Sequence, residues 1–178
     1  MELIPLDDEG TLRLVSRWLA DGEDHPWLHL GGSEQRLSAG NMRRMIDDEA
    51  HIVRVFTSDE AGVPIGLVAL SSVNPDFRTA VLWAFLADRG HEPGSYLRRA
   101  ASAMLTLGFS EHGLECINAW TLEGNQDSLR VLQELNFRPI GRERRAESKD
   151  GRDFDKLLFE LMAAEHRSDD ARDARTAG

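Results

Sequence analysis

The stretch "LEGNQDSLRVLQELNFRPIGRERR" (residues 122–145) decides the fold, because it joins three kinds of element in a short space. Its middle, "NQDSLRVLQEL", has apolar residues at helical spacing, and Asn125 at its start is a good N-cap residue. An apolar strand pattern, "LECINAWTL", comes before this helix. After it, "FRPIGRERRAES" and "RDFDKLLFELM" are typical of two strands joined by a turn at "KDG". This part of the chain therefore predicts a strand, a helix and a hairpin.

Upstream, "DRGHEPGSYL" (residues 88–97) separates the strand pattern "FRTAVLWAFLA" from the helical pattern "YLRRAASAMLTLGFSEHG", which Gly113 can close. Together with the next strand this is a β–α–β unit, which needs a crossover and so predicts locally parallel strands. A loop in that position is where a phosphate is commonly held, and such loops are usually glycine-rich. Here Pro93 occupies the middle, and Gly90 and Gly94 are the only glycines.

The N-terminal part supplies the remaining elements. "MELIPL" predicts a short edge strand, a helix is expected to open at Thr11, and a second helix is expected from Ser38 to Asp48 with Ser38 as its N-cap. The alternating segments "HIVRVFTS" and "VPIGLVALSSV", separated by "DEAG", predict a hairpin. The full order predicts an α/β (α+β) fold, a single domain with a mixed β-sheet and helices on both faces.

Length and charge narrow the class of protein. A chain of 178 residues is expected to form one domain, here residues 1–165, and the polar residues 166–178 are expected to be a disordered tail. The net charge of −10 argues against nucleic acid as a partner, because binding to a phosphate backbone needs clustered lysine and arginine. It mildly favours a neutral or cationic substrate, although acidity that only keeps the protein soluble is the simpler explanation.

Cysteine content and hydropathy bear on location. Cys116 is the only cysteine, which excludes an intramolecular disulfide and any metal site with several cysteine ligands. An unpaired thiol fits a reducing compartment. No apolar run approaches the ~20 residues that span a bilayer, and the acidic N-terminus does not resemble a secretory signal. We therefore expect no membrane association, no bound metal and a cytoplasmic location.

Residues 122–145 resemble the C-terminal half of the GNAT superfamily, the acyl-CoA-dependent N-acyltransferases, and look most like the branch of the ribosomal-protein-alanine acetyltransferases. In that branch an Asn-x-x-Ser motif opens a helix that ends in Gly-Phe, and Asn125, Ser128 and Phe137 match these positions. The element order fits from about residue 3 to residue 163. The helix-ending glycine is Asn136 here, a residue that also tolerates a left-handed cap.

The resemblance implies acetyl-CoA or another acyl-CoA as co-substrate. Its pyrophosphate would lie at the N–H groups at the N-terminus of the helix that follows the loop, here Gly94, Ser95, Tyr96 and Leu97. Pro93 and Ser95 stand where two family glycines are expected, so the phosphate loop departs from the family pattern. Arg98 and Arg99 could reach a nucleotide phosphate or could be solvated helix residues. The pantetheine arm would pair with strand backbone around Phe85 and Leu86.

The expected reaction is attack of a primary amine on the thioester carbonyl, with protonation of the leaving thiolate. Many superfamily members use a tyrosine seven residues after the asparagine as the acid, and Leu132 occupies that position. The resemblance makes Ser128 the candidate proton donor and Asn125 the group that orients the cofactor or a bound water. Helix capping alone would also explain both residues. The base could be a water relay or one of several side chains: His25, His29, His51, Glu23, Asp24 or Asp76.

Three functions remain open on these residues. The first is an N-acyltransferase acting on an amine of a small molecule or a protein N-terminus. The loop "DGEDHPWLHL" is a candidate wall for that acceptor, with Trp27 either packing on it or anchoring the loop. The second is a non-catalytic module that binds acyl-CoA on the same fold. The third is a scaffold in which exposed strand edges pair two chains into a homodimer.

Overall fold

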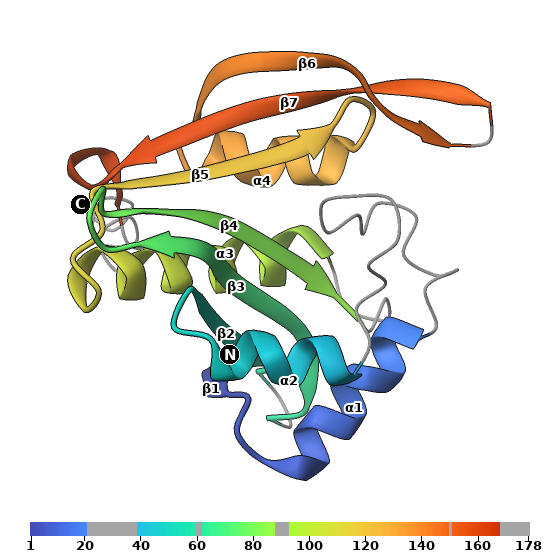
Figure 1. The fold of residues 1–178 in the computed structure, drawn as a ribbon, viewed down its shortest axis with the longest axis vertical. Coiled ribbons are helices and arrows are strands. Elements are labelled where there is room, and N and C mark those ends of the chain that lie inside the picture. The colour runs from blue at the N-terminus through green and yellow to red at the C-terminus, as the bar shows by residue number, and fades with distance from the viewer. Residues whose placement is uncertain (21–38, 60–61, 88–92, 150, 168–178) are drawn as a thin grey trace.

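The computed structural model describes residues 1–20, 39–59, 62–87, 93–149 and 151–167. Figure 1 shows these residues as one sheet with helices packed on it. The elements in chain order are β1 (Leu3–Pro5), α1 (Glu9–Ala20), α2 (Ala39–Asp47), β2 (His51–Thr57), β3 (Pro64–Asn74), β4 (Thr79–Leu86), α3 (Pro93–Ser110), β5 (Cys116–Leu122), α4 (Gln126–Glu134), β6 (Arg138–Lys149), β7 (Arg152–Met162) and the short 3₁₀ helix η2 (Ala163–Glu165). Up to β7, this is the order that the sequence predicts.

The strands form one mixed sheet in the order β1-β2-β3-β4-β5-β7-β6. Strands β1 to β4 are antiparallel neighbours, and so are β5, β7 and β6. The pair β4–β5 is parallel, because α3 carries the chain back across the sheet between them. The predicted crossover and the predicted mixed sheet are both confirmed.

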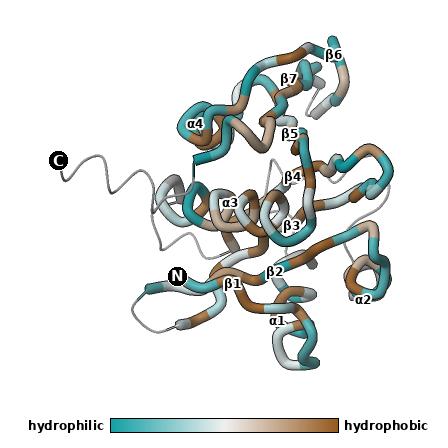
Figure 2. The backbone as a smooth tube through the Cα atoms, turned by 90° about the vertical axis from the view of Figure 1, so that its left-hand side faces the viewer, coloured by the Kyte–Doolittle hydropathy of each residue, from teal (hydrophilic) through white to brown (hydrophobic). Residues whose placement is uncertain are grey.

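Each face of the sheet has its own core. Helices α3 and α4 bury Met104, Leu105 and Leu135 on one face, against strand residues such as Ile117 and Phe159. On the other face, α1 and α2 bury Val15 and Met42 against Val53, Val55 and Leu67. Figure 2 shows α3 and α4 on one side of the strands and α2 on the other. Helices therefore cover both faces, as the sequence predicts.

Two helices begin earlier than the sequence pattern suggests. Helix α1 begins at Glu9 and not at Thr11, because the Asp8 carboxylate accepts the N–H groups of Gly10 and Thr11 at 2.8 and 2.9 Å and so caps it. Helix α3 begins at Pro93, since proline lacks an N–H and its fixed φ suits the first helical position. The predicted N-cap of α2, Ser38, lies outside the described residues.

The ends of the elements follow residue chemistry. Asn136 ends the α4 segment with φ +66°, the left-handed conformation that the sequence predicts for it, and Gly113 after α3 has φ +62°. The polar tail is predicted to begin at residue 166, but His166 still packs on the domain. The ring of His166 packs against Phe109, and its Nε2 lies 2.8 Å from Oγ1 of Thr106 on α3. Among the described helices, none is long and apolar enough to cross a membrane.

Candidate active site

Strands β4 and β5 pair at one end and separate at the other. Their register pairs Thr79 with Cys116, Ala80 with Ile117 and Val81 with Asn118. Beyond this point β4 runs on to Leu86 and β5 to Leu122, each bonded only to its outer neighbour in the described chain. Figure 1 shows the two strands diverging toward their arrowheads. We call the paired part the closed end and the diverging part the open end.

Backbone groups of β4 face the open end. The Ala87 N–H donates to the Ile65 carbonyl at 2.8 Å, so Ala87 and Ile65 form a hydrogen-bonded pair of the β3–β4 ladder. Such pairs alternate along antiparallel strands, which places the N–H and C=O of Phe85 toward Leu67 on β3. Ala84 and Leu86 then point their backbone groups toward β5. Of the predicted pair, Leu86 faces the open end, while the backbone of Phe85 belongs to the ladder.

Strand β5 faces the same space by the same alternation. The Glu123 N–H donates to the Asp155 carbonyl at 2.8 Å, just beyond the register pair Leu122–Lys156. Trp120 and Leu122 therefore direct their N–H and C=O groups away from β7 and toward β4. Within the described residues, the open end is thus bordered by unpaired peptide groups of both central strands, and an extended chain could bind to either border as an added strand would.

The start of α3 follows β4 in the chain. With Pro93 as the first helical residue, the unbonded N–H groups that open the helix are those of Gly94 and Ser95. Tyr96 and Leu97 are the fourth and fifth helical residues, whose N–H groups enter the intrahelical ladder. Of the four residues whose N–H groups are predicted to bind the pyrophosphate, only the first two, Gly94 and Ser95, therefore have N–H groups outside the helical ladder. Gly90, the other glycine of the loop, lies outside the described residues.

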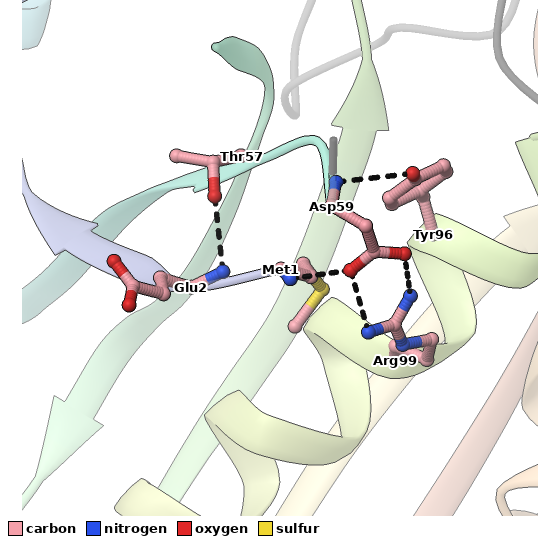
Figure 3. A network of polar contacts seen from close by, with 6 residues as sticks. All are labelled: Met1, Glu2, Thr57, Asp59, Tyr96 and Arg99. Carbon is pink, nitrogen blue, oxygen red and sulfur yellow. Dashed lines mark hydrogen bonds and ion pairs between the residues drawn. The ribbon is translucent and has the colours of Figure 1, made fainter. Parts of the chain in front are cut away.

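A polar network surrounds the first turns of α3 (Figure 3). The Arg99 guanidinium donates to both oxygens of Asp59, at 2.6 and 2.9 Å, and the Met1 ammonium binds the same carboxylate. These two cations hold the pKa of the Asp59 carboxyl well below its usual value, chiefly through the hydrogen bonds from Arg99. The Tyr96 hydroxyl accepts the Asp59 N–H at 3.2 Å. Tyr96, on α3, thus contacts the β2–β3 turn.

The other arginine of this segment points to α4. The Nε of Arg98 lies 3.9 Å from the Glu134 carboxylate, and the Arg98 side chain is about one quarter exposed, at 26%. The alternative that Arg98 and Arg99 are simply solvated is therefore wrong, because each is held by an acidic side chain of a different element.

The start of α4 follows β5, at the open end of the strand pair. The Asn125 side-chain oxygen accepts the Ser128 N–H at 3.2 Å, so the expected N-cap is confirmed. Ser128 is half-buried, and within the described part of the chain its hydroxyl has no hydrogen-bond partner. Leu132 is buried in the α3–α4 core, which leaves no acid at the family's tyrosine position.

Two of the candidate bases lie away from the open end. His51 pairs with Ser71, which pairs with Val81, so His51 lies two strands from β4 and level with the last closed pair. Asp76 is in the exposed turn between β3 and β4, where β4 begins at the closed end. The other candidate bases and Trp27 lie outside the described residues. These bases are His25, His29, Glu23 and Asp24.

Sequence reasoning missed three features of this region. The peptide groups of Ala84 and Trp120 face the open end, and no residue type signals which way a peptide group points. Asp59 and Arg99 are separated by 40 positions in the chain, and surface charges at such a distance carry no pairing signal.

A mixed sheet whose central parallel strands part between two helix starts is the architecture of an acyl-CoA-dependent N-acyltransferase. The sequence pattern of the acetyltransferase (GNAT) domain family matches residues 1–138. The chain therefore belongs to the GNAT acetyltransferase family, and its predicted class, an N-acetyltransferase that uses acetyl-CoA, is confirmed.

Solved structures agree on the fold. A spermidine N-acetyltransferase from Vibrio cholerae in complex with CoA and spermine has a TM-score of 0.78 at 19% identity, covering 92% of this chain and 96% of that one. RimJ from Mycobacterium smegmatis in complex with CoA-disulfide has a TM-score of 0.75 at 24% identity, covering 99% and 88%. Among curated proteins, no sequence matches the chain significantly.

Proposed function

We propose that this protein transfers an acyl group, most readily acetyl, from acyl-CoA to a primary amine of a small molecule or a protein N-terminus. The observation that carries the proposal is the open end, where the peptide groups of Ala84 and Leu86 have no neighbouring strand among the described residues and lie beside the starts of α3 and α4. The amine attacks the thioester carbonyl directly, so the C–N bond forms as the C–S bond breaks.

The chain's own groups fit acyl-CoA in two places. The backbone of Ala84 and Leu86 can pair with the amides of the pantetheine arm, in the manner of an added strand. The N–H groups of Gly94 and Ser95 open α3, where the helix dipole favours an anion such as the pyrophosphate. Pro93 removes one donor but fixes the first helical turn, so the departure from the family glycines alters this site without abolishing it.

Ser128 is the proposed proton donor. Its hydroxyl lies in the first turn of α4 at the open end and can protonate the departing sulfur, while water takes the proton lost by the amine and returns a proton to the Ser128 oxygen. Asn125 fixes this turn by accepting the Ser128 N–H, and its amide group can orient the cofactor or a bound water. Asn125 therefore combines a capping role with a binding role.

The acceptor is proposed to be cationic. The net charge of −10 attracts polyamines and other basic amines at long range. One similar structure is a spermidine N-acetyltransferase bound to spermine, which supports small polyamines as the first acceptors to test. Another form of that protein is dodecameric, which supports self-association here, and β1 and β6 are the sheet edges at which two copies could meet.

A thiol-release screen tests the function. Purified protein is mixed with acetyl-CoA or longer acyl-CoAs and with polyamines, amino sugars, amino acids or peptides bearing a free N-terminus. We expect amine-dependent release of CoA that falls steeply in Ser128→Ala. Acyl-CoA that raises the melting temperature without any thiol release would support the non-catalytic binding module. If no acyl-CoA shifted the melting temperature even at millimolar concentration, the proposed function would be refuted.

A further inference from the structure

The Asp59–Arg99 pair joins two elements that the fold already holds together by other means. Helix α3 is fixed by a buried stripe that includes Ala100, Ala101, Met104 and Leu105. The ion pair lies at the surface, with 32% of the Arg99 side chain and 45% of the Asp59 side chain exposed. A bidentate pair joined by a third charge can add more to stability than an isolated exposed pair, but the buried stripe already fixes α3, so the pair is available for a second role.

The pair does fix the direction of the Arg99 side chain. Two parallel hydrogen bonds to one carboxylate define the plane of the guanidinium as well as its position. The Arg99 guanidinium carbon also lies 5.7 Å from the centre of the Tyr96 ring, whose hydroxyl accepts the Asp59 N–H. Arg99, Tyr96 and Asp59 thus form one unit at the start of α3 (Figure 3).

This unit lies beside the donors proposed for the pyrophosphate. Ser95 and Arg99 are four residues apart and so share one face of α3. Helical side chains lean toward the N-terminus, so the surface covered by Arg99 lies over the helical turn before it. The β2–β3 turn that carries Asp59 is at the same end of the sheet, because Gly66 near the start of β3 pairs with Leu86 at the end of β4.

We propose that Arg99 binds the anionic half of acyl-CoA and that Asp59 is the positioning residue that orients it. The inference rests on the proposed function, and it adds a cation from a side chain to the backbone donors Gly94 and Ser95. Guanidinium groups are suited to phosphate, and a fixed guanidinium loses less freedom on binding than a solvated one. Asp59 therefore acts on the cofactor through Arg99 and touches neither the thioester nor the amine.

The test compares Arg99→Met and Asp59→Asn with Arg78→Met as the matched control. Arg78 forms a similar exposed pair with Glu115, at 2.9 Å, at the closed end of β4. Calorimetric titration with CoA is expected to show a dissociation constant about tenfold higher in Arg99→Met and about threefold higher in Asp59→Asn. Arg78→Met is expected to bind CoA as the wild type does.

A second substrate separates binding from folding. S-acetyl-pantetheine carries the thioester and the pantetheine arm but no phosphate, so its kcat/KM should be the same in all four proteins. Equal losses with acetyl-CoA and S-acetyl-pantetheine would mean that the pair is structural. A CoA dissociation constant unchanged in Arg99→Met, or not raised in Asp59→Asn, would overturn the assigned roles. If the wild type itself failed to bind CoA, the proposed function would fail before this inference was reached.

Discussion

The closed and open ends of the β4–β5 pair are built from the same two strands, yet they present opposite surfaces. At the closed end the peptide group of Ala80 faces β5 and lies within the parallel ladder. At the open end the peptide group of Ala84, two periods of the alternation further along, faces the same way and meets no strand of the described chain. The two residues are identical in type. Strand divergence, and not side-chain chemistry, distinguishes the structural backbone from the proposed binding surface.

The largest expected effect concerns Ser128, the side chain proposed to donate a proton at the open end. Ser128→Ala removes the proposed proton donor and should lower kcat about a hundredfold while leaving the KM for acetyl-CoA nearly unchanged. Ser102→Ala is the matched control, because the Ser102 hydroxyl is buried on α3 and has no hydrogen-bond partner in the described chain. Steady-state thiol release measures both variants. Equal rates in Ser128→Ala and the wild type would remove Ser128 from the mechanism.

Two proline substitutions, one at each end of the β4–β5 pair, distinguish the proposed binding role of the open end from the structural role of the closed end. Ala84→Pro removes an N–H that no strand of the described chain uses. We expect the acyl-CoA dissociation constant to rise about tenfold or more, or about 1.4 kcal/mol, with little loss of stability. Ala80→Pro removes an N–H from the closed ladder and should lower the free energy of unfolding by about 1–3 kcal/mol. Denaturant unfolding and CoA titration are measured on both. The proposed difference between the closed and open ends would be contradicted if Ala84→Pro were less stable than Ala80→Pro, or if Ala84→Pro bound CoA as the wild type does.

The start of α3 gives a third effect. A side chain at Gly94 would stand where an anion must approach the helix-opening N–H groups, so Gly94→Val should raise the acyl-CoA dissociation constant by about tenfold, or about 1.4 kcal/mol. Isothermal titration calorimetry measures it, and circular dichroism checks that the helix is intact. A folded Gly94→Val protein with unchanged affinity would mean that residues 88–97 only connect β4 to α3.

The smallest effect lies outside the site. Asn136 has φ +66°, a left-handed conformation that asparagine tolerates better than alanine because its short polar side chain can hydrogen-bond locally, so Asn136→Ala should lower the free energy of unfolding by about 1 kcal/mol. Asn136→Gly suits that conformation and should be neutral or slightly stabilising. Thermal unfolding of both variants is the measurement. A loss of CoA affinity in either would show that the α4 cap and the open end are coupled.

The sequence predicts elements well where residue type alone carries the information. Asn125 as a cap, Asn136 in the left-handed conformation and the parallel crossover around α3 all depend on local chemistry or chain length, and all are confirmed. It fails where the outcome depends on register or distant partners. The peptide group of Ala84, and not that of Phe85, faces β5, and this follows from the hydrogen bond between the Ala87 N–H and the Ile65 carbonyl. The orientation of the Arg99 side chain follows from its pairing with Asp59 in the β2–β3 turn.

Amide hydrogen exchange on the wild-type protein, with and without CoA, tests the central claim most directly. If the open end holds acyl-CoA, saturating CoA should slow exchange at the Ala84 and Leu86 amides and leave Phe85 unchanged, because the Phe85 amide already belongs to the β3–β4 ladder. Unchanged exchange at Ala84 and Leu86, in a sample whose melting temperature CoA has raised, would place the cofactor elsewhere and contradict the account.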